Sequence, residues 1–259
     1  MLPLLIASLL GASAGTAQTP ADPVAARYAL CSKDLAGTAS NGAMRLTSRA
    51  EDTICFGGAI TPESMAALMQ AVRAVPANRP LQLVLLSSGG HASAALEVAE
   101  ELLRRDVTVV TGPICASACA NYLFMAADRR VVGPKSILAF HGGRSASLIG
   151  QVEAALAAAR AKKDGAATAQ LTAALQRLQA ERPREQALLR AAGVDVAFFD
   201  RFDRLTPCPG TRVRAFVFSP EALGRSGVKV SGWFGPKSEA QLQALLAPAG
   251  LSGTMCYRG

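Results

Sequence analysis

Short apolar runs, each followed by small or reactive residues, form the clearest pattern in the chain. The runs span residues 81–86, 107–110 and 137–140. They lead into Ser87-Ser88-Gly89-Gly90, into Cys115-Ala116-Ser117-Ala118-Cys119, and into His141. Continuous apolar runs of this length are typical of strands that are buried on both faces of a parallel sheet. The pattern therefore predicts an α/β protein with its chemistry at the strand ends.

Helical spacing appears between and after these runs. Residues 92–105 repeat apolar positions at a helical period, so a strand, a helix and a second strand follow one another as a βαβ crossover with parallel strands. Thr61-Pro62-Glu63 is a helix start, and that helix is expected to reach about residue 75. A second helix of small residues is expected over 116–127. The stretch 148–192 lacks strand signals and predicts a helical arm or lid, broken near Gly165.

The flanking segments complete the expected organisation. Residues 42–60 resemble a hairpin-like pair of strands, and 213–218 reads as a further strand before a helix start. We expect a signal peptide at 1–17, a loose Ala- and Pro-rich segment at 18–41, an α/β domain at 42–235 with a helical insertion at about 148–192, and a C-terminal tail at 236–259.

The first 17 residues have the pattern of an export signal. An apolar segment precedes Ala12-Ser13-Ala14, which fits a cleavage site, and cleavage after Ala17 is a second option. The segment is short for a membrane span but lacks an initial Lys or Arg, so an uncleaved anchor is the competing interpretation. No later stretch is apolar enough to span a bilayer. We expect a periplasmic or secreted protein without a membrane span after cleavage.

Cysteine content agrees with export into an oxidising compartment. The chain contains six cysteines, at positions 31, 55, 115, 119, 208 and 256. Proximity in sequence favours Cys31 with Cys55 and Cys208 with Cys256; Cys115 and Cys119 would then pair across one turn or remain buried thiols. The chain has two histidines and no CxxC motif, so no metal is expected. No phosphate-binding loop is present, and no cofactor is expected.

The net charge of +8 raises the question of a nucleic-acid partner. Arg far outnumbers Lys, but the basic residues are scattered in single positions and short pairs without interleaved aromatic residues. This distribution is typical of a solvated basic surface, and no nucleic acid is expected.

Taken together, the motifs resemble the ClpP/crotonase superfamily, and within it the periplasmic ClpP-like proteins. Ser-Ser-Gly-Gly at 87–90 is similar to the family's Ser-Pro-Gly-Gly turn, Ala116-Ser117-Ala118 to its nucleophile motif, and Phe140-His141 to its catalytic His after a strand. The similarity resumes around 218–230. It implies a spiral of βαβ units with a helical insertion and a serine peptidase activity on extended peptide or protein substrates.

The resemblance gives roles to four residues. Ser117 is the expected nucleophile and His141 its general base, because a serine hydroxyl needs a base to take its proton. Gly89 and Ala118 are the expected oxyanion-hole donors, because developing negative charge needs nearby N–H groups. Taken singly, each has a plainer interpretation: Ser117 as a small packing residue, His141 as a cap or core histidine, and Gly89 as part of an ordinary turn. His91 follows that turn and is expected to be exposed or to line the substrate groove.

The third member of a catalytic triad is where the sequence departs from the family. The family's Asp would fall near Arg214, where there is no carboxylate. Asp200 and Asp203 are the candidate replacements, with Asp195 and Glu221 as further options. Losing this carboxylate lowers the rate of such a site without removing all activity. A substitute carboxylate, a slow Ser–His pair and a decayed site all remain open.

Other functions compete with the peptidase hypothesis. A Ser–Lys pair is one, with Lys162 or Lys163 as the base. A second is a non-catalytic member of the fold that binds peptides or proteins, which the missing carboxylate favours. A third is an acyl-CoA enzyme, which export argues against. In ClpP the segment corresponding to 148–192 makes oligomer contacts, so a homo-oligomer is expected; the greater length of the segment in this chain departs from the ClpP double ring.

Overall fold

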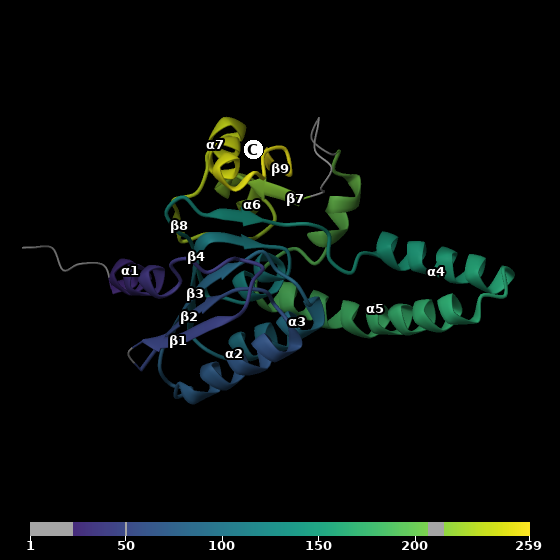
Figure 1. Cartoon of the computed structure of the whole chain (residues 1–259), viewed down its shortest axis with the longest axis horizontal. Helices are drawn as coiled ribbons and strands as arrows, with labels where there is room; N and C mark the ends of the chain where they lie inside the picture. The colour runs from purple at the N-terminus through teal and green to yellow at the C-terminus, as the bar shows by residue number, and fades with distance from the viewer. Residues whose placement is uncertain (1–22, 50, 207–214) are drawn as a thin grey trace, which may run out of the picture.

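The structure is a computed structural model, and it describes residues 23–49, 51–206 and 215–259. It is a mixed α/β fold in which helices flank a mostly parallel central sheet (Figure 1). The sheet contains β1 (Arg45–Arg49), β2 (Thr53–Gly57), β3 (Leu81–Ser87), β4 (Val107–Ala116), β5 (Arg129–Val132), β6 (Ile137–Ala139) and β8 (Gly232–Trp233). Their order is β1-β2-β3-β4-β5-β8, with β6 also paired to β4. Only the β1–β2 pair in this sheet is antiparallel, which confirms the expected hairpin and the expected α/β class.

Most of the helices lie at the predicted positions. They are α1 (Pro23–Asp34), α2 (Pro62–Ala74), α3 (Ala92–Leu102), α4 (Ala146–Ala161), α5 (Gly165–Ala191), α6 (Pro220–Gly224) and α7 (Glu239–Leu246). Short turns of other types are the π-helix η1 (Cys119–Phe124) and the 3₁₀ helices η2 (Phe199–Arg204) and η3 (Ala247–Ala249). Thr61 caps α2 as expected, through a reciprocal pair of hydrogen bonds with Ser64.

Strand β4 organises the sheet because its two halves have different neighbours. Residues Thr108–Thr111 pair with β5, whereas Ile114–Ala116 pair with β6. Along its other side β4 pairs with β3, up to Ser87 opposite Cys115. The carboxyl ends of β3, β4 and β6 therefore meet at one edge of the sheet, where a parallel α/β fold places its reactive groups.

Different helices cover the two faces of the sheet. α2 and α3 pack on one face, with apolar residues of β2, β3 and β4 that include Phe56, Leu83 and Val109. The opposite face carries Cys55, Val84, Leu86 and Val110, and it is covered by Cys31 of α1 and by Leu35, the residue that follows α1. Figure 1 shows α1 and α2 on opposite sides of the strands.

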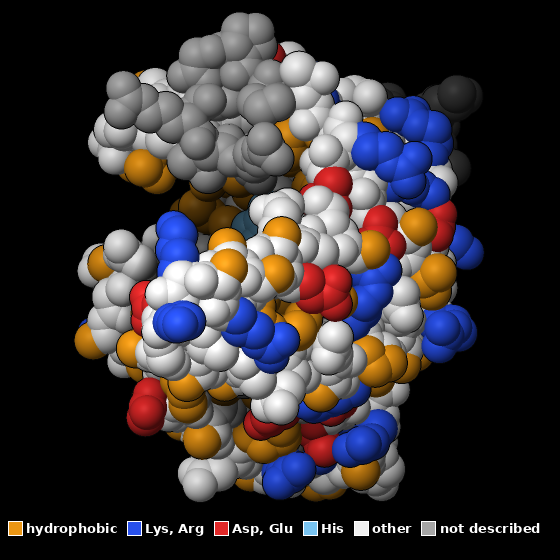
Figure 2. All heavy atoms as spheres, turned by 90° about the vertical axis from the view of Figure 1, so that its right-hand side faces the viewer, with side chains coloured by type: hydrophobic (Ala, Val, Ile, Leu, Met, Phe, Trp, Pro, Cys, Tyr) orange, Lys and Arg blue, Asp and Glu red, His pale blue; other side chains and the backbone are white. Residues whose placement is uncertain are grey.

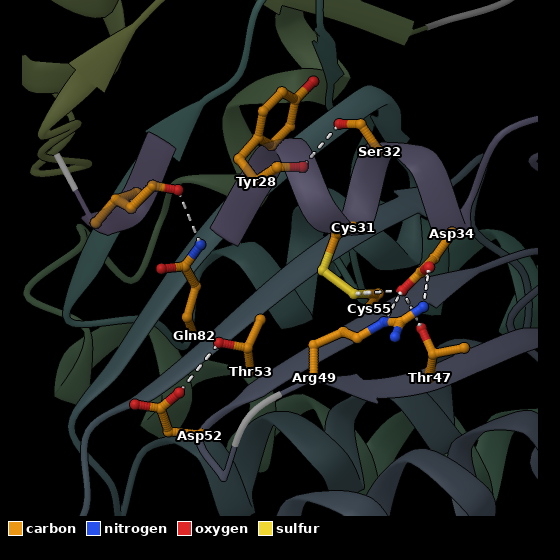
Figure 3. Close-up of a disulfide and its surroundings, with 11 residues drawn as sticks. Tyr28, Cys31, Ser32, Asp34, Thr47, Arg49, Asp52, Thr53, Cys55 and Gln82 are labelled. Atoms are coloured by element: carbon orange, nitrogen blue, oxygen red, sulfur yellow. Dashed lines mark hydrogen bonds and ion pairs between the residues drawn. A yellow bond between two sulfur atoms is a disulfide. The ribbon is translucent and has the colours of Figure 1, made fainter. Parts of the chain in front are cut away.

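Helix α1 corrects the expectation that residues 18–41 are loose. Its attachment is covalent, because Cys31 and Cys55 form the predicted disulfide between α1 and β2. Figure 3 shows a polar contact beside it, in which Asp34 at the end of α1 accepts hydrogen bonds from Arg49 and Thr47 of β1. The Ala- and Pro-rich composition suggested weak local structure, but the disulfide and the burial of Leu35 outweigh that tendency.

The C-terminal residues correct a second expectation, that 236–259 form a tail. β9 (Met255–Arg258) pairs in parallel with β7 (Ala215–Phe218) as a second sheet. α7 buries Leu242 and Leu246 against Ile137, Ala139 and Val217. The segment is thus part of the folded body, and it packs on the strand that precedes His141.

The expected helical insertion projects from the body as an arm of two antiparallel helices, α4 and α5 (Figure 1). The predicted break is confirmed, because Gly165 is the first residue of α5. α5 continues through Pro183 to Ala191. In the part of the chain that the structure describes, neither this long helix nor any other has a stretch of sufficient length and hydropathy to cross a membrane.

Candidate functional site

Ser117 and His141 meet at the carboxyl edge of the sheet. Ser117 Oγ lies 2.6 Å from His141 Nε2, although the residues are 24 positions apart. The parallel pairing of β4 with β6 sets Ala116 opposite Ala139, and the Ser117 N–H extends it by donating to the Ala139 carbonyl at 3.0 Å. Both side chains are partly buried. The pair is therefore a direct product of the sheet register.

The contact of His141 Nδ1 identifies the tautomer of the ring. His141 Nδ1 lies 2.6 Å from the carbonyl oxygen of Gly142. A carbonyl oxygen only accepts hydrogen bonds, so Nδ1 must carry a proton. In the neutral ring Nε2 is then unprotonated and accepts the Ser117 hydroxyl proton, as general-base chemistry requires.

The backbone at Ser117 makes a sharp turn between strand and helix. Ser117 has a φ of +55°, in the left-handed region that only a few per cent of non-glycine residues adopt. β4 ends at Ala116 and the π-helix η1 begins at Cys119, so the expected α-helix over 116–127 is replaced by a turn and a short π-helix. Backbone strain and π-helical turns both occur often at functional sites.

A disulfide closes this turn. Cys115 and Cys119 are joined, with the serine midway between them, which decides between the two alternatives that the sequence left open. Cys256 is also disulfide-bonded, and its predicted partner Cys208 lies outside the described residues. Disulfides are compatible with an exported protein.

The Gly89–Gly90 turn lies directly against Ser117. A Cβ at Gly89, which has a φ of +101°, would fall 2.6 Å from Ser117 Cβ and 3.0 Å from Ala118 N. Only glycine fits this position. The Gly89 N–H donates to Ser87 Oγ at 3.1 Å. Among the described residues, neither the Gly90 N–H nor the Ala118 N–H has a hydrogen-bond partner.

Asn121 connects the segments that carry Ser117 and His141. It lies one turn after Ser117, and its Nδ2 donates to the His141 carbonyl at 3.1 Å. The side chain is buried, and its Oδ1 has no hydrogen-bond partner in the described structure. Nothing in the sequence pattern indicated this contact, because a single Asn in an Ala-rich segment carries no signal of its own.

The candidates for a third triad member lie elsewhere. The Asp200 carboxylate accepts hydrogen bonds from Arg182 and from the Ala146 N–H, and Asp203 is exposed on η2. Asp195 forms an ion pair with Arg201, and Glu221 lies in the first turn of α6. The position near Arg214 is outside the described residues. The partner that the structure gives to His141 Nδ1 is thus a backbone carbonyl.

The remaining candidate residues are also separated from the pair. Lys162 and Lys163 are exposed in the turn between α4 and α5, at the projecting end of the arm (Figure 1). This position does not favour a Ser–Lys mechanism. His91 is exposed and caps α3, where its Nδ1 accepts a hydrogen bond from the Ala94 N–H.

Sequence reasoning missed a buried charged cluster behind the pair, formed by Tyr122, Arg144, Glu181 and Glu185. Arg144 forms ion pairs with both carboxylates, which α5 supplies, and Tyr122 lies in η1. The Tyr122 hydroxyl accepts from Arg144 and donates to Glu185. Burial, together with the negative charge of Glu185, raises the pKa of Tyr122 well above its usual value, so the hydroxyl keeps its proton.

One side of the molecule is hollowed. Figure 2 views the side from which the arm projects, and a hollow there has hydrophobic side chains and a histidine at its floor. Within residues 23–49, 51–206 and 215–259, no three His, Cys, Asp or Glu side chains gather in an arrangement that would hold a metal ion.

Comparison with known proteins gives no family for the chain. No protein-family model matches it, and neither does any curated protein. Function must therefore be inferred from the geometry.

Proposed function

We propose that the chain is an exported serine peptidase with a ClpP/crotonase-like fold. The observation that carries the proposal is the Ser117–His141 contact of 2.6 Å with Nδ1 turned to a carbonyl. Nucleophile and base are within hydrogen-bond reach, and the base has the productive tautomer. The parallel βαβ units, the helical arm and the disulfides support the fold and the export that the resemblance implies.

In this mechanism Ser117 Oγ attacks the peptide carbonyl while His141 Nε2 takes the hydroxyl proton. The proton then passes to the leaving amine as the C–N bond breaks, which leaves an acyl-enzyme. Water, activated by the same Nε2, releases the acid and restores the serine. The Ala118 N–H stabilises the oxyanion together with an N–H of the Gly89–Gly90 turn. A single such donor contributes about 10²–10³ in rate.

A carbonyl in the place of the triad carboxylate has a clear chemical consequence. A carboxylate fixes the tautomer of the histidine and stabilises the imidazolium that forms during attack. The Gly142 oxygen fixes the tautomer in full. It stabilises the imidazolium only through the dipole of the carbonyl group. We therefore expect a slower enzyme than a Ser-His-Asp peptidase, with the same nucleophile.

Substrates would be extended peptides. The side from which the arm projects has a hollow with hydrophobic side chains and a histidine at its floor (Figure 2), and extended peptides bind along sheet edges by main-chain hydrogen bonds. The second candidate function is peptide or protein binding without catalysis, and the engagement of Asp200 by Arg182 favours it, because that carboxylate is withheld from His141.

A fluorophosphonate probe distinguishes the two functions. It reacts with an activated serine by forming a bond from Oγ to phosphorus as fluoride leaves. The oxidised mature protein is compared with Ser117→Ala and His141→Ala, and with His91→Ala as the matched control. Labelling in wild type and His91→Ala, lost in the other two variants, is the expected result. A folded wild type that is not labelled would overturn the peptidase proposal in favour of the binding function.

A further inference from the structure

The charged cluster behind the catalytic pair joins three elements that are far apart in sequence. Tyr122 comes from η1 five positions after Ser117, Arg144 from the loop three positions after His141, and Glu181 and Glu185 from α5 of the arm. All four residues are more than nine-tenths buried. Buried charges persist only when they are paired and hydrogen-bonded, and each of these is.

Glu185 makes the contacts that reach the backbone of the His141 loop. Its Oε1 accepts a hydrogen bond from the Arg144 N–H at 3.0 Å, and its Oε2 accepts from the Tyr122 hydroxyl at 2.6 Å. The carboxylate also lies against Gly143, where a Cβ would fall 2.6 Å from Oε2. A side chain at position 143 would therefore displace Glu185 or the loop.

The loop itself has little intrinsic preference for one conformation. Gly142 and Gly143 follow His141, and glycine backbones populate more conformations than other residues do. Yet the Gly142 carbonyl must keep one direction, because it accepts the Nδ1 proton of His141 at 2.6 Å. The contacts of Glu185 with Gly143 and with the Arg144 N–H fix the backbone that follows this carbonyl.

We propose that Glu185 is a positioning residue for His141. By holding Gly143 and the Arg144 N–H, Glu185 keeps the Gly142 carbonyl on Nδ1 and so keeps Nε2 directed at Ser117. It does not touch the ring, and it serves the reaction through the backbone. The inference rests on the proposed function for its catalytic meaning, whereas the orientation of His141 can be measured without any activity.

The test uses the tautomer of His141 as a readout that a merely structural role would not move. With two histidines in the chain, long-range ¹H–¹⁵N spectra contain two rings, and His91→Asn assigns them. The wild type is expected to show a single neutral tautomer protonated at Nδ1. Glu185→Ala is expected to show a mixture of tautomers and a fluorophosphonate labelling rate about 10 to 100 times lower.

Two further variants keep the test decisive. Glu185→Gln is isosteric and keeps an acceptor for the Arg144 N–H, so we expect it to fold. Its labelling rate and its proportion of tautomers should lie between those of the wild type and Glu185→Ala. If Glu185→Ala does not fold, Glu185→Gln decides. Glu153→Gln, an exposed carboxylate on α4, is the matched control and is expected to behave as wild type.

The results separate two kinds of failure. Folded Glu185 variants with the wild-type tautomer and labelling rate would overturn the positioning role. An unlabelled wild type with a tautomer that still depends on Glu185 would overturn the peptidase proposal and leave the positioning role supported.

Discussion

Cys115 and Cys119 are joined by a disulfide that encloses Ser117 in a ring of five residues. The strand end, the turn and the first residue of η1 all lie within this ring. The serine therefore keeps its left-handed backbone between two covalently linked positions. This disulfide forms in an oxidising compartment, so this part of the site would reach its final structure there.

Removing this disulfide is expected to reduce the reactivity of the serine. In the double variant Cys115→Ala/Cys119→Ala the turn at Ser117 can relax toward the common backbone region, which moves Oγ away from His141. We expect a labelling rate at least about tenfold lower and a loss of about 2 kcal/mol in unfolding free energy. Labelling kinetics and denaturant unfolding measure the two effects.

The other described disulfide provides the control for that experiment. Cys31→Ala/Cys55→Ala releases α1 from β2 on the opposite side of the sheet from α2 and α3. This variant opens a longer loop, so it is expected to lose about 3.5 kcal/mol in unfolding free energy, while the folded fraction labels at the wild-type rate. Equal rate losses in both double variants would show that the Cys115–Cys119 ring has no special effect on Ser117.

The close approach of Gly89 to the nucleophile predicts a severe effect of a single methyl group. Gly89→Ala places a Cβ within 2.6 Å of Ser117 Cβ and at a φ of +101°. We expect labelling to be abolished and stability to fall by about 2–3 kcal/mol. The matched control is Gly150→Ala in α4, where a Cβ meets open space and stability should rise by up to about 1 kcal/mol.

Removing the charge of Asp200 is expected to leave the reactivity of Ser117 unchanged. Its carboxylate is engaged by Arg182 and Ala146, so Asp200→Asn is expected to leave the labelling rate and its pH profile unchanged. Asp203→Asn should behave in the same way. A strong fall in either variant would identify that carboxylate as the third triad member and contradict the role proposed for the Gly142 carbonyl.

The contact between α1 and β1 predicts a pH dependence of stability. The hydrogen bond from Arg49 lowers the pKa of Asp34 from 3.8 to about 2. A carboxylate whose pKa is lower in the folded state stabilises the fold above its unfolded pKa, and this contribution is lost as the pH falls through the folded value. Asp34→Asn should therefore lower the thermal midpoint at pH 7, and the difference from wild type should shrink between pH 4 and pH 2.

A control for this prediction is Asp203→Asn, which removes the charge of an exposed carboxylate on η2. Its melting curve should follow the wild type across the same pH range. A difference between Asp34→Asn and wild type that persists unchanged to low pH would show that the charge of Asp34 is not the cause.

The strand ends were predictable because each depends on a local pattern. Unbroken apolar runs identify β3 and β4 without knowledge of the rest of the chain, and residues that follow parallel strands must meet at one edge. The pairing of Ser117 with His141 came from the resemblance to the ClpP/crotonase superfamily, and the strand pattern is compatible with it. The turn at Ser117 was not predicted, because Ala-rich composition favours helix and the disulfide that overrides it is a tertiary constraint.

The charged cluster was not predictable for a related reason. Glu181 and Glu185 lie in a sequence rich in Arg and Gln, which is typical of a solvated helix face. Their burial follows from the docking of α5 against η1 and the His141 loop, and no local pattern encodes that contact. α1 was missed similarly, since its order depends on Cys31 reaching β2.

Helix α5 connects the tip of the arm with the segment that follows His141. The helix has 27 residues and extends from the projecting tip at Gly165 to the body. The tip lies about 24 Å along the helix from Glu181, at 1.5 Å per residue. Near the body end of this helix, Glu181 and Glu185 pair with Arg144, which lies in the loop after His141. One continuous helix therefore joins the projecting tip to the loop of His141 through contacts that do not involve the central sheet.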